Sequence, residues 1–329
     1  MSYLFVFLAA FFWGGSFVAT RYALTDGGLG IFTVLAARFL LSSLILLVLV
    51  AVRGWERLGR RRLGILVGAA VVYPGLYFFL ETAGIARTSA VLTSIIISII
   101  PVLTGVTARL FLKERLALRG WVGALLSVGG IAAIVLLGRS AKGTAGEVSW
   151  LGVLVLSGAV IMGTIYITST RYLVGNRGLL AMGSVRPLTL TTVQNVMGFL
   201  FFVPFAGAEM VRGLPAPGLG SLAAIGFLGV GASVGAILSF NKALSLIEAA
   251  RASMFLNVIP VISLLFGWLL LGERLATLQL LAGAVVIGGV TLGSWRSGGP
   301  RENGSQLDGD AAILPGERPA EGEGKDDES

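Results

Sequence analysis

The stretch that decides the fold runs from Ser89 to Gly130, and an altered copy of it runs from Glu248 to Gly289. Each copy is an apolar run with one proline, then a short charged turn, then a glycine-rich apolar run. The first copy reads Ile100-Pro101-Val102, Leu112-Lys113-Glu114-Arg115-Leu116-Ala117 and Gly129-Gly130. The second reads Ile259-Pro260-Val261, Leu271-Gly272-Glu273-Arg274-Leu275-Ala276 and Gly288-Gly289. The copies align without a gap, 159 residues apart, which indicates a chain of two related halves.

Composition places the chain in a membrane. Hydrophobic residues make up 55% and charged residues 13% of the sequence, and the mean hydropathy is +0.89. A soluble domain has roughly twice that charged fraction. The sequence contains neither cysteine nor histidine, which excludes disulfides, Cys/His zinc sites and imidazole- or thiol-based catalysis. We therefore expect no metal and no cofactor.

Ten apolar segments have the length of membrane-spanning helices, five in each half. In the first half they are Tyr3–Tyr22, Ile31–Val52, Leu63–Ala86, Ser89–Leu112 and Arg119–Gly138. In the second half they are Ser149–Leu173, Leu188–Phe205, Gly218–Ile247, Ala249–Leu271 and Ala276–Trp295. These segments predict an all-α membrane protein with ten transmembrane helices. The expected boundaries are a first repeat at 1–138, a linker at 139–148, a second repeat at 149–296 and a disordered acidic tail at 297–329.

The net charge of +8 is explained by topology better than by nucleic-acid binding. The basic residues occupy short loops between apolar runs and form no continuous stripe. Most of them face one side if the N-terminus is cytoplasmic, as the positive-inside rule requires. Because each half has five spans, the two halves then enter the membrane from opposite sides. The sequence thus predicts an inverted repeat, a common plan of secondary transporters, with both termini in the cytoplasm.

Three prolines interrupt apolar runs and are candidate hinges: Pro74, Pro101 and Pro260. A proline within a helix removes a backbone hydrogen bond and kinks the helix. Pro101 and Pro260 occupy equivalent positions in the two halves, and paired breaks near the midplane are where inverted-repeat carriers bind substrate. The alternative is a kink that serves only packing. For Glu114 and Glu273 we favour a structural role, because a carboxylate stabilises a helix start.

Four ionisable residues lie inside predicted spans: Arg38, Glu81, Arg109 and Lys242. Each costs about 2.5–3.5 kcal/mol at the bilayer centre on insertion scales, so each needs a partner or a hydrated cavity. Glu81 and Lys242 belong to equivalent helices of the two halves. They are interpreted either as a cavity pair that binds a zwitterion or relays a proton, or as a static ion pair, or as side chains that snorkel separately.

Other polar and aromatic side chains within the spans are candidates to line a cavity. Together with Glu81 and Lys242, they are Trp13, Ser16, Tyr73, Tyr77, Ser94, Ser98, Tyr166, Asn241 and Asn257. Ser98 and Asn257 are repeat equivalents and precede Pro101 and Pro260 by three positions, which places each on the face of its proline. None of these residues is a nucleophile with an adjacent base, so we expect no catalytic residue.

This combination resembles the drug/metabolite transporter superfamily, in its EamA branch. The resemblance rests on the proline, Glu-Arg-Leu and Gly-Gly motifs of both halves, on Trp13-Gly14 and on Arg38, and it covers about residues 3–295. It implies a ten-helix inverted-repeat carrier with cytoplasmic termini and a central cavity lined by helices one, three, four, six, eight and nine. It also implies transport of small metabolites, often by export.

The sequence therefore predicts an exporter of small metabolites such as amino acids, working by alternating access in the plasma (inner) membrane. Expected partners are the lipid bilayer, a small-molecule substrate and a proton as a candidate coupling ion, with no nucleic acid, and the protein is expected to be a monomer or a homodimer. One alternative is a carrier of sugar phosphates or nucleotide sugars, or a flippase of lipid-linked sugars. Another is a membrane-embedded enzyme, which would need paired carboxylates or an activated nucleophile.

Overall fold

The computed structural model describes residues 2–112, 149–174, 185–213, 216–247, 255–273 and 277–294, with separate residues between 119 and 133 and at 249 and 252. All of them belong to one unit, Met1–Trp295. The predicted linker and acidic tail lie outside the described residues, and so does most of the fifth predicted span.

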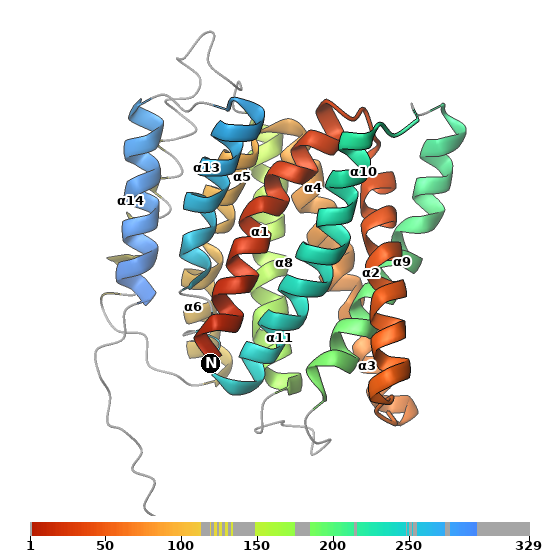
Figure 1. Ribbon diagram of the computed structural model, residues 1–329. Coiled ribbons are helices and arrows are strands. Elements are labelled where there is room, and N and C mark those ends of the chain that lie inside the picture. Colours follow the sequence, from red (N-terminus) through yellow and green to blue (C-terminus); the bar gives the residue numbers. More distant parts are fainter. Residues whose placement is uncertain are drawn as a thin grey trace, which may run out of the picture. The chain divides into compact units, whose positions relative to one another are not determined.

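Every regular element within the described residues is a helix (Figure 1). The first part of the chain forms α1 (Ser2–Thr25), α2 (Ile31–Arg53), α3 (Arg60–Ala70), the π-helix η1 (Val71–Leu76), α4 (Tyr77–Arg87), α5 (Ala90–Ile97) and α6 (Ile100–Leu112). The second part forms α8 (Trp150–Val174), α9 (Pro187–Val211), α10 (Leu219–Gly226), the π-helix η2 (Phe227–Ala236), α11 (Ile237–Leu246), the 3₁₀-helix η3 (Phe255–Val258), α13 (Ile259–Leu271) and α14 (Thr277–Ser294).

Seven helical segments of the described residues are long and apolar enough to cross a membrane: Tyr3–Thr25, Ile31–Arg53, Arg60–Arg87, Ala90–Thr107, Trp150–Arg171, Pro187–Val211 and Leu219–Leu246. Two shorter apolar helices, Ile259–Leu271 and Leu280–Gly289, follow. These segments account for nine of the ten predicted spans, so the all-helical membrane fold is confirmed and the count of ten stays a prediction. Large apolar side chains such as Val211 (89% exposed) and Leu219 (85% exposed) face outward, as expected of lipid-facing surface.

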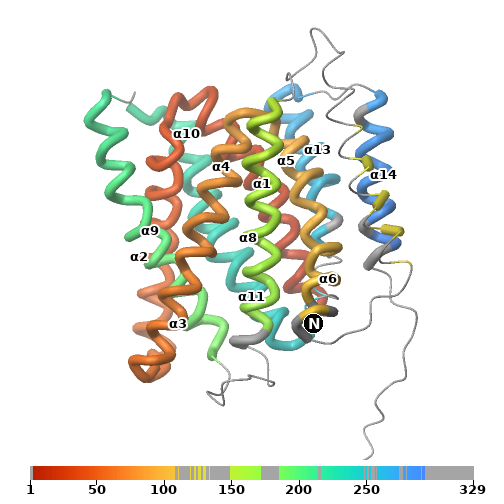
Figure 2. Tube along the Cα trace, turned by 180° about the vertical axis from the view of Figure 1, so that it is seen from behind, coloured from red at the N-terminus to blue at the C-terminus, as the bar shows by residue number. Residues whose placement is uncertain are grey.

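The equivalent helices α2 and α9 lie side by side and run in opposite directions (Figures 1 and 2). At one end, the backbone N–H of Arg186, just before α9, donates to Glu56 Oε2 (2.8 Å), just after α2. At the other end, the N–H of Thr33 in α2 donates to Glu209 Oε2 in α9 (2.8 Å). An antiparallel pair of equivalent helices is what an inverted repeat requires.

A second contact between the halves joins α5 and α13, which belong to the equivalent fourth and ninth predicted spans. The carboxylate of Glu273, directly after α13, accepts hydrogen bonds from the N–H groups of Ala90 (3.1 Å) and Val91 (3.2 Å) at the start of α5. Glu273 was predicted to stabilise a helix start, and it does so for a helix of the other half rather than for the helix that follows it in sequence. The carboxylate satisfies two N–H groups that lack partners within α5. Glu114, its first-half equivalent, lies outside the described residues.

The three prolines lie at or beside changes in helix geometry. Pro101 is the second residue of α6, after a break at Ser98 and Ile99 that separates α6 from α5. Pro260 is the second residue of α13, directly after η3. Each proline thus begins a helix instead of kinking one, because the first turn needs no N–H donor at that position. Pro74 lies inside η1, where Tyr73 leaves the helical conformation (φ −141°, ψ 116°).

Candidate functional site

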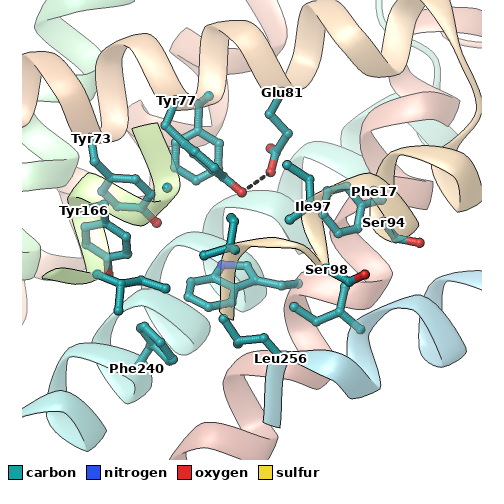
Figure 3. A pocket seen from close by; sticks show the side chains of 16 residues that line it. Phe17, Tyr73, Tyr77, Glu81, Ser94, Ile97, Ser98, Tyr166, Phe240 and Leu256 are labelled. Atoms are coloured by element: carbon teal, nitrogen blue, oxygen red, sulfur yellow. Dashed lines mark hydrogen bonds between the residues drawn. The ribbon is translucent and has the colours of Figure 1, made fainter. Parts of the chain in front are cut away.

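A buried cavity lies where the two halves meet (Figure 3). It is lined by Trp13, Phe17, Tyr73, Tyr77, Phe78, Glu81, Ser94, Ile97, Ser98, Ile100, Gly163, Tyr166, Ile167, Phe240, Leu256 and Ile259. These residues come from α1, η1–α4, α5–α6, α8, α11 and η3–α13, which correspond to predicted helices one, three, four, six, eight and nine. The set of lining helices is therefore the one that the resemblance implied. The cavity volume is about 40 Å³, which is room for a few water molecules only.

Aromatic rings form much of the wall. The rings of Tyr73 and Tyr166 stack with centroids 3.5 Å apart and an interplanar angle of 9°, and they join the first half to the second. The ring of Trp13 packs against that of Phe240, with centroids 5.1 Å apart. Such rings present large apolar faces with few polar atoms, so this wall favours contact with apolar groups.

Glu81 is the one carboxylate among the described residues of the lining. Its side chain is 4% exposed, and its Oε1 accepts a hydrogen bond from the Tyr77 hydroxyl (2.7 Å), one helical turn away on α4 (Figure 3). The i and i+4 positions of a helix share one face, which explains why both side chains reach the same cavity. A buried carboxylate with a single hydrogen-bond donor keeps further acceptor capacity for a ligand.

Arg38 lies beside the cavity and behind Phe78. Its side chain is 0% exposed, and its Nε donates to Ser233 Oγ of η2 (3.0 Å). The guanidinium carbon lies 4.4 Å from the ring centroid of Phe78 and 5.4 Å from that of Phe39, within the range of cation–π attraction. Within the described part of the chain, Nη1 and Nη2 have no hydrogen-bond partner. The charges of Arg38 and Glu81 are close enough to interact electrostatically.

Lys242 does not reach the cavity. Its side chain is exposed on α11, whereas its neighbour Asn241 is buried. The structure therefore does not bring Glu81 and Lys242 together, because their equivalent helices present these two positions to different surroundings. The cation near Glu81 is Arg38, which the sequence placed inside a span without assigning it to the pair.

Asn241 forms a second layer behind Tyr166. Its Oδ1 accepts a hydrogen bond from the Tyr166 hydroxyl (2.8 Å), and its Nδ2 donates to Thr191 Oγ1 (2.9 Å) and Gln194 Oε1 (3.0 Å). These bonds connect α8, α9 and α11 inside the second half. A connected buried network of this kind holds its members in fixed positions, so it orients the Tyr166 ring against Tyr73.

Most of the predicted cavity residues line the cavity, and the others do not or are not described. Seven of them line the cavity: Trp13, Tyr73, Tyr77, Glu81, Ser94, Ser98 and Tyr166. Ser16 is buried, and its hydroxyl donates to the carbonyl of Trp13 in its own helix (2.8 Å). Ser94 and Ser98 also donate to carbonyls of their own helix. The side chains of Asn257 and Arg109 lie outside the described residues.

The lining residues that the sequence missed are apolar: Phe17, Phe78, Ile97, Ile100, Gly163, Ile167, Phe240, Leu256 and Ile259. An apolar residue in a span faces lipid, a neighbouring helix or a cavity, and its identity does not distinguish these cases. For two of these residues the repeat could have predicted a place in the lining, because Ile100 and Ile259 are equivalents that directly precede Pro101 and Pro260.

With this geometry established, comparison with known proteins identifies the family. The model for the EamA-like transporter family matches residues 1–136 and 150–295. The chain belongs to the EamA-like transporter family. It is a multi-pass membrane protein, and transporters of this family act on small-molecule substrates. The resemblance recognised from the motifs is thereby confirmed.

Relatives of this EamA protein are named transporters. It is 30% identical to the uncharacterized transporter YcxC of Bacillus subtilis, over 87% of this chain and 90% of that one. It is 26% identical to an uncharacterized transporter of Archaeoglobus fulgidus, over 85% and 93% of the two chains. It is also 26% identical to the probable terminal-alkyne amino-acid exporter of Streptantibioticus cattleyicolor, over 89% and 93%. A solved crystal structure with 16% identity shares the fold, with a TM-score of 0.61 over 89% and 96% of the two chains.

Proposed function

We propose that this protein exports small metabolites, with amino acids as the substrate class, by alternating access across the plasma (inner) membrane. Both termini lie in the cytoplasm in this proposal, as the arginines of the loops indicate. A relative named as a probable amino-acid exporter supports the substrate class. The role is transport and not catalysis, since the relatives carry the name of transporters.

The observation that carries the proposal is the cavity between the halves. Among its described lining residues, the carboxylate is that of Glu81, and several of the lining helices change geometry beside a proline. The cavity volume of about 40 Å³ is too small for an amino acid, so a substrate of that size enters only when the surrounding helices move apart. The turn at Ser98 and Ile99 before Pro101, and the change from 3₁₀-helix to α-helix before Pro260, are points at which those spans can bend. A small cavity between the halves fits a stage of alternating access in which the helices lie close together.

The charge of the cavity argues against the alternatives. A sugar phosphate or nucleotide sugar carries two or more negative charges and needs several cations around it. The charged side chain in the lining is Glu81, an acid that repels phosphate, and Arg38 adds one cation behind Phe78. An enzyme would need a second acid, a base or an activated nucleophile beside Glu81, and the lining offers none within the described residues.

The test is counterflow in proteoliposomes. Purified full-length protein is reconstituted, the vesicles are loaded with a mixture of unlabelled amino acids, and uptake of each labelled amino acid is followed with and without a pH gradient. We expect uptake of at least one amino acid above that of protein-free vesicles, and dependence on the gradient if a proton is the coupling ion. Absence of uptake of every amino acid in active vesicles would rule out this substrate class.

A further inference from the structure

We propose that Arg38 is the group that binds the substrate's carboxylate, while Glu81 binds its ammonium group, so that the transported molecules are apolar α-amino acids. This inference rests on the proposed function and extends it to named residues. It assigns to Arg38 a role in specificity, replacing the pair of Glu81 and Lys242 that the sequence suggested.

The guanidinium of Arg38 is incompletely hydrogen-bonded. A guanidinium has five N–H donors, and the side chain of Arg38 is fully buried with a hydrogen bond only at Nε. Nη1 and Nη2, which carry four of the five donors, have no partner among the described residues. Leaving such donors buried and unpaired is costly, and native proteins rarely do so without a functional reason. The two amino groups are therefore available to a ligand.

Arg38 lies next to the cavity wall. The guanidinium lies over the ring of Phe78, 4.4 Å from its centroid, and Phe78 lines the cavity, whereas Arg38 is not among the described lining residues. A rotation of the Phe78 side chain opens the guanidinium to the cavity without moving α2, and aromatic side chains change rotamer readily once their packing loosens.

Arg38 and Glu81 lie at the same cavity without bonding to each other. Arg38 lies over the ring of Phe78, and Phe78 and Glu81 both line the cavity, yet Glu81 accepts its hydrogen bond from Tyr77 and not from Arg38. Two opposite charges held near one another but unpaired match a ligand that carries both charges on one small group. A guanidinium fits a carboxylate through two parallel hydrogen bonds, and a carboxylate accepts from an ammonium.

The rest of the lining is mainly apolar. Besides Glu81 and the Tyr73 hydroxyl, which has no hydrogen-bond partner among the described residues, the cavity presents mainly aromatic and aliphatic side chains, and the hydroxyls of Ser94 and Ser98 donate within their own helix. A polar or charged ligand side chain would find few partners there, which costs free energy. An apolar side chain meets no such penalty. The site therefore selects apolar amino acids.

The experiment compares ligands that differ by one charged group. Purified full-length protein in detergent is titrated with leucine, with 3-methylbutylamine, which lacks the carboxylate, and with 4-methylpentanoate, which lacks the amine. Affinity is taken from the ligand-induced rise in melting temperature. Phenylalanine, 2-phenylethylamine and 3-phenylpropanoate form a second series. The variants are Arg38→Gln and Glu81→Gln, and Lys242→Gln is the matched control that also removes one cation.

We expect the wild type to bind each amino acid at least about tenfold more tightly than either analogue, the loss of one charge-assisted contact. Arg38→Gln should weaken binding of the amino acid about tenfold or more and leave the amine unchanged, whereas Glu81→Gln should weaken the amine and leave the acid unchanged. Lys242→Gln should behave as wild type. Equal weakening of amino acid and amine in Arg38→Gln would assign Arg38 to packing and overturn the proposal.

Further measurements test the proposal whether or not Arg38→Gln folds. Equal affinity of the wild type for leucine and 3-methylbutylamine, and for the phenylalanine pair, overturns the proposal without any variant. Arg38→Lys, which keeps the charge but not the two-pronged geometry, should weaken the amino acid selectively. If neither amino acid binds while the counterflow mixture is transported, this inference fails and the proposed function stands. If the mixture is not transported either, both fail.

Discussion

Thr33 at the start of α2 donates two hydrogen bonds to one carboxylate oxygen of Glu209, near the end of α9. The Thr33 backbone nitrogen lies 2.8 Å and its Oγ1 3.0 Å from Glu209 Oε2, and Phe32 N lies 3.2 Å from Oε1. The carboxylate therefore satisfies the first turn of a helix from the other half and complements its dipole. Since Glu56 accepts from the start of α9, the two antiparallel helices cap each other.

Replacing Glu209 with alanine should destabilise the protein by about 1–2 kcal/mol, the usual cost of removing a helix cap. The reason is that Phe32 and Thr33 then lose an acceptor at a partly buried position. Thermal unfolding of the purified protein in detergent measures the change. Asp26→Ala is the matched control, because Asp26 is exposed and its carboxylate accepts only from the neighbouring Thr25 hydroxyl among the described contacts. A melting temperature for Glu209→Ala as high as that of the control would contradict the capping role.

The inverted plan could be predicted from the sequence, but the contacts that hold it could not. Two copies of a proline motif and a Glu-Arg turn, with an odd number of spans in each, are enough to indicate opposite orientation. The bond between Thr33 and Glu209 joins residues 176 positions apart, and Glu209 was expected to lie beyond a span that ended at Phe205. The helix continues through Pro204 to Val211, because later residues remain apolar enough to stay in the membrane.

Gly163→Ala should reduce substrate flux, because this glycine lines the cavity and leaves no room for a methyl group. A Cβ at Gly163 would lie 2.6 Å from Ile100 Cδ1 and 3.0 Å from Tyr77 Cε2. Relief of those contacts pushes Tyr77 away from Glu81 or narrows the space for substrate. Flux in proteoliposomes, normalised to inserted protein, is the measurement. Gly207→Ala, in α9 with open space around its Cβ, should retain wild-type flux. Equal flux in both variants would show that the cavity tolerates the methyl group and that substrate passes elsewhere.

A reporter inserted at Thr144 should be extracytoplasmic, whereas reporters at the N-terminus and after Ser297 should be cytoplasmic. With five spans before the linker and five after it, the linker lies on the opposite side of the membrane from both termini. The loop arginines indicate that the termini are on the cytoplasmic side. Alkaline phosphatase activity and green fluorescent protein fluorescence at each position measure the side. A cytoplasmic signal at Thr144 would contradict an odd number of spans in the first half, and with it the predicted boundaries of the repeats.

The polar part of the site could be read from the sequence, and its pairing could not. A charged residue in an apolar span is conspicuous, so Glu81, Arg38 and Lys242 were all recognised as requiring a partner. Which of them meet depends on the rotation of each helix about its axis, which packing against neighbours determines. The rotation of α11 buries Asn241 and exposes Lys242. The hydropathy pattern does not predict which of two adjacent polar residues in an apolar helix faces the interior.

Glu81→Gln should lower amino-acid flux about tenfold or more, because it removes the charge that attracts the substrate's ammonium group. Lys242→Gln should leave flux unchanged, since Lys242 is exposed and does not line the cavity. The double variant should then equal Glu81→Gln alone, which gives a coupling free energy near zero between distant, independent sites. Flux and the amount of inserted protein are measured separately, so that a folding defect is not mistaken for a transport defect. Recovery of flux in the double variant would instead reveal an ion pair between these residues in another stage of transport, and the assignment of Arg38 as the cation of the site would have to be abandoned.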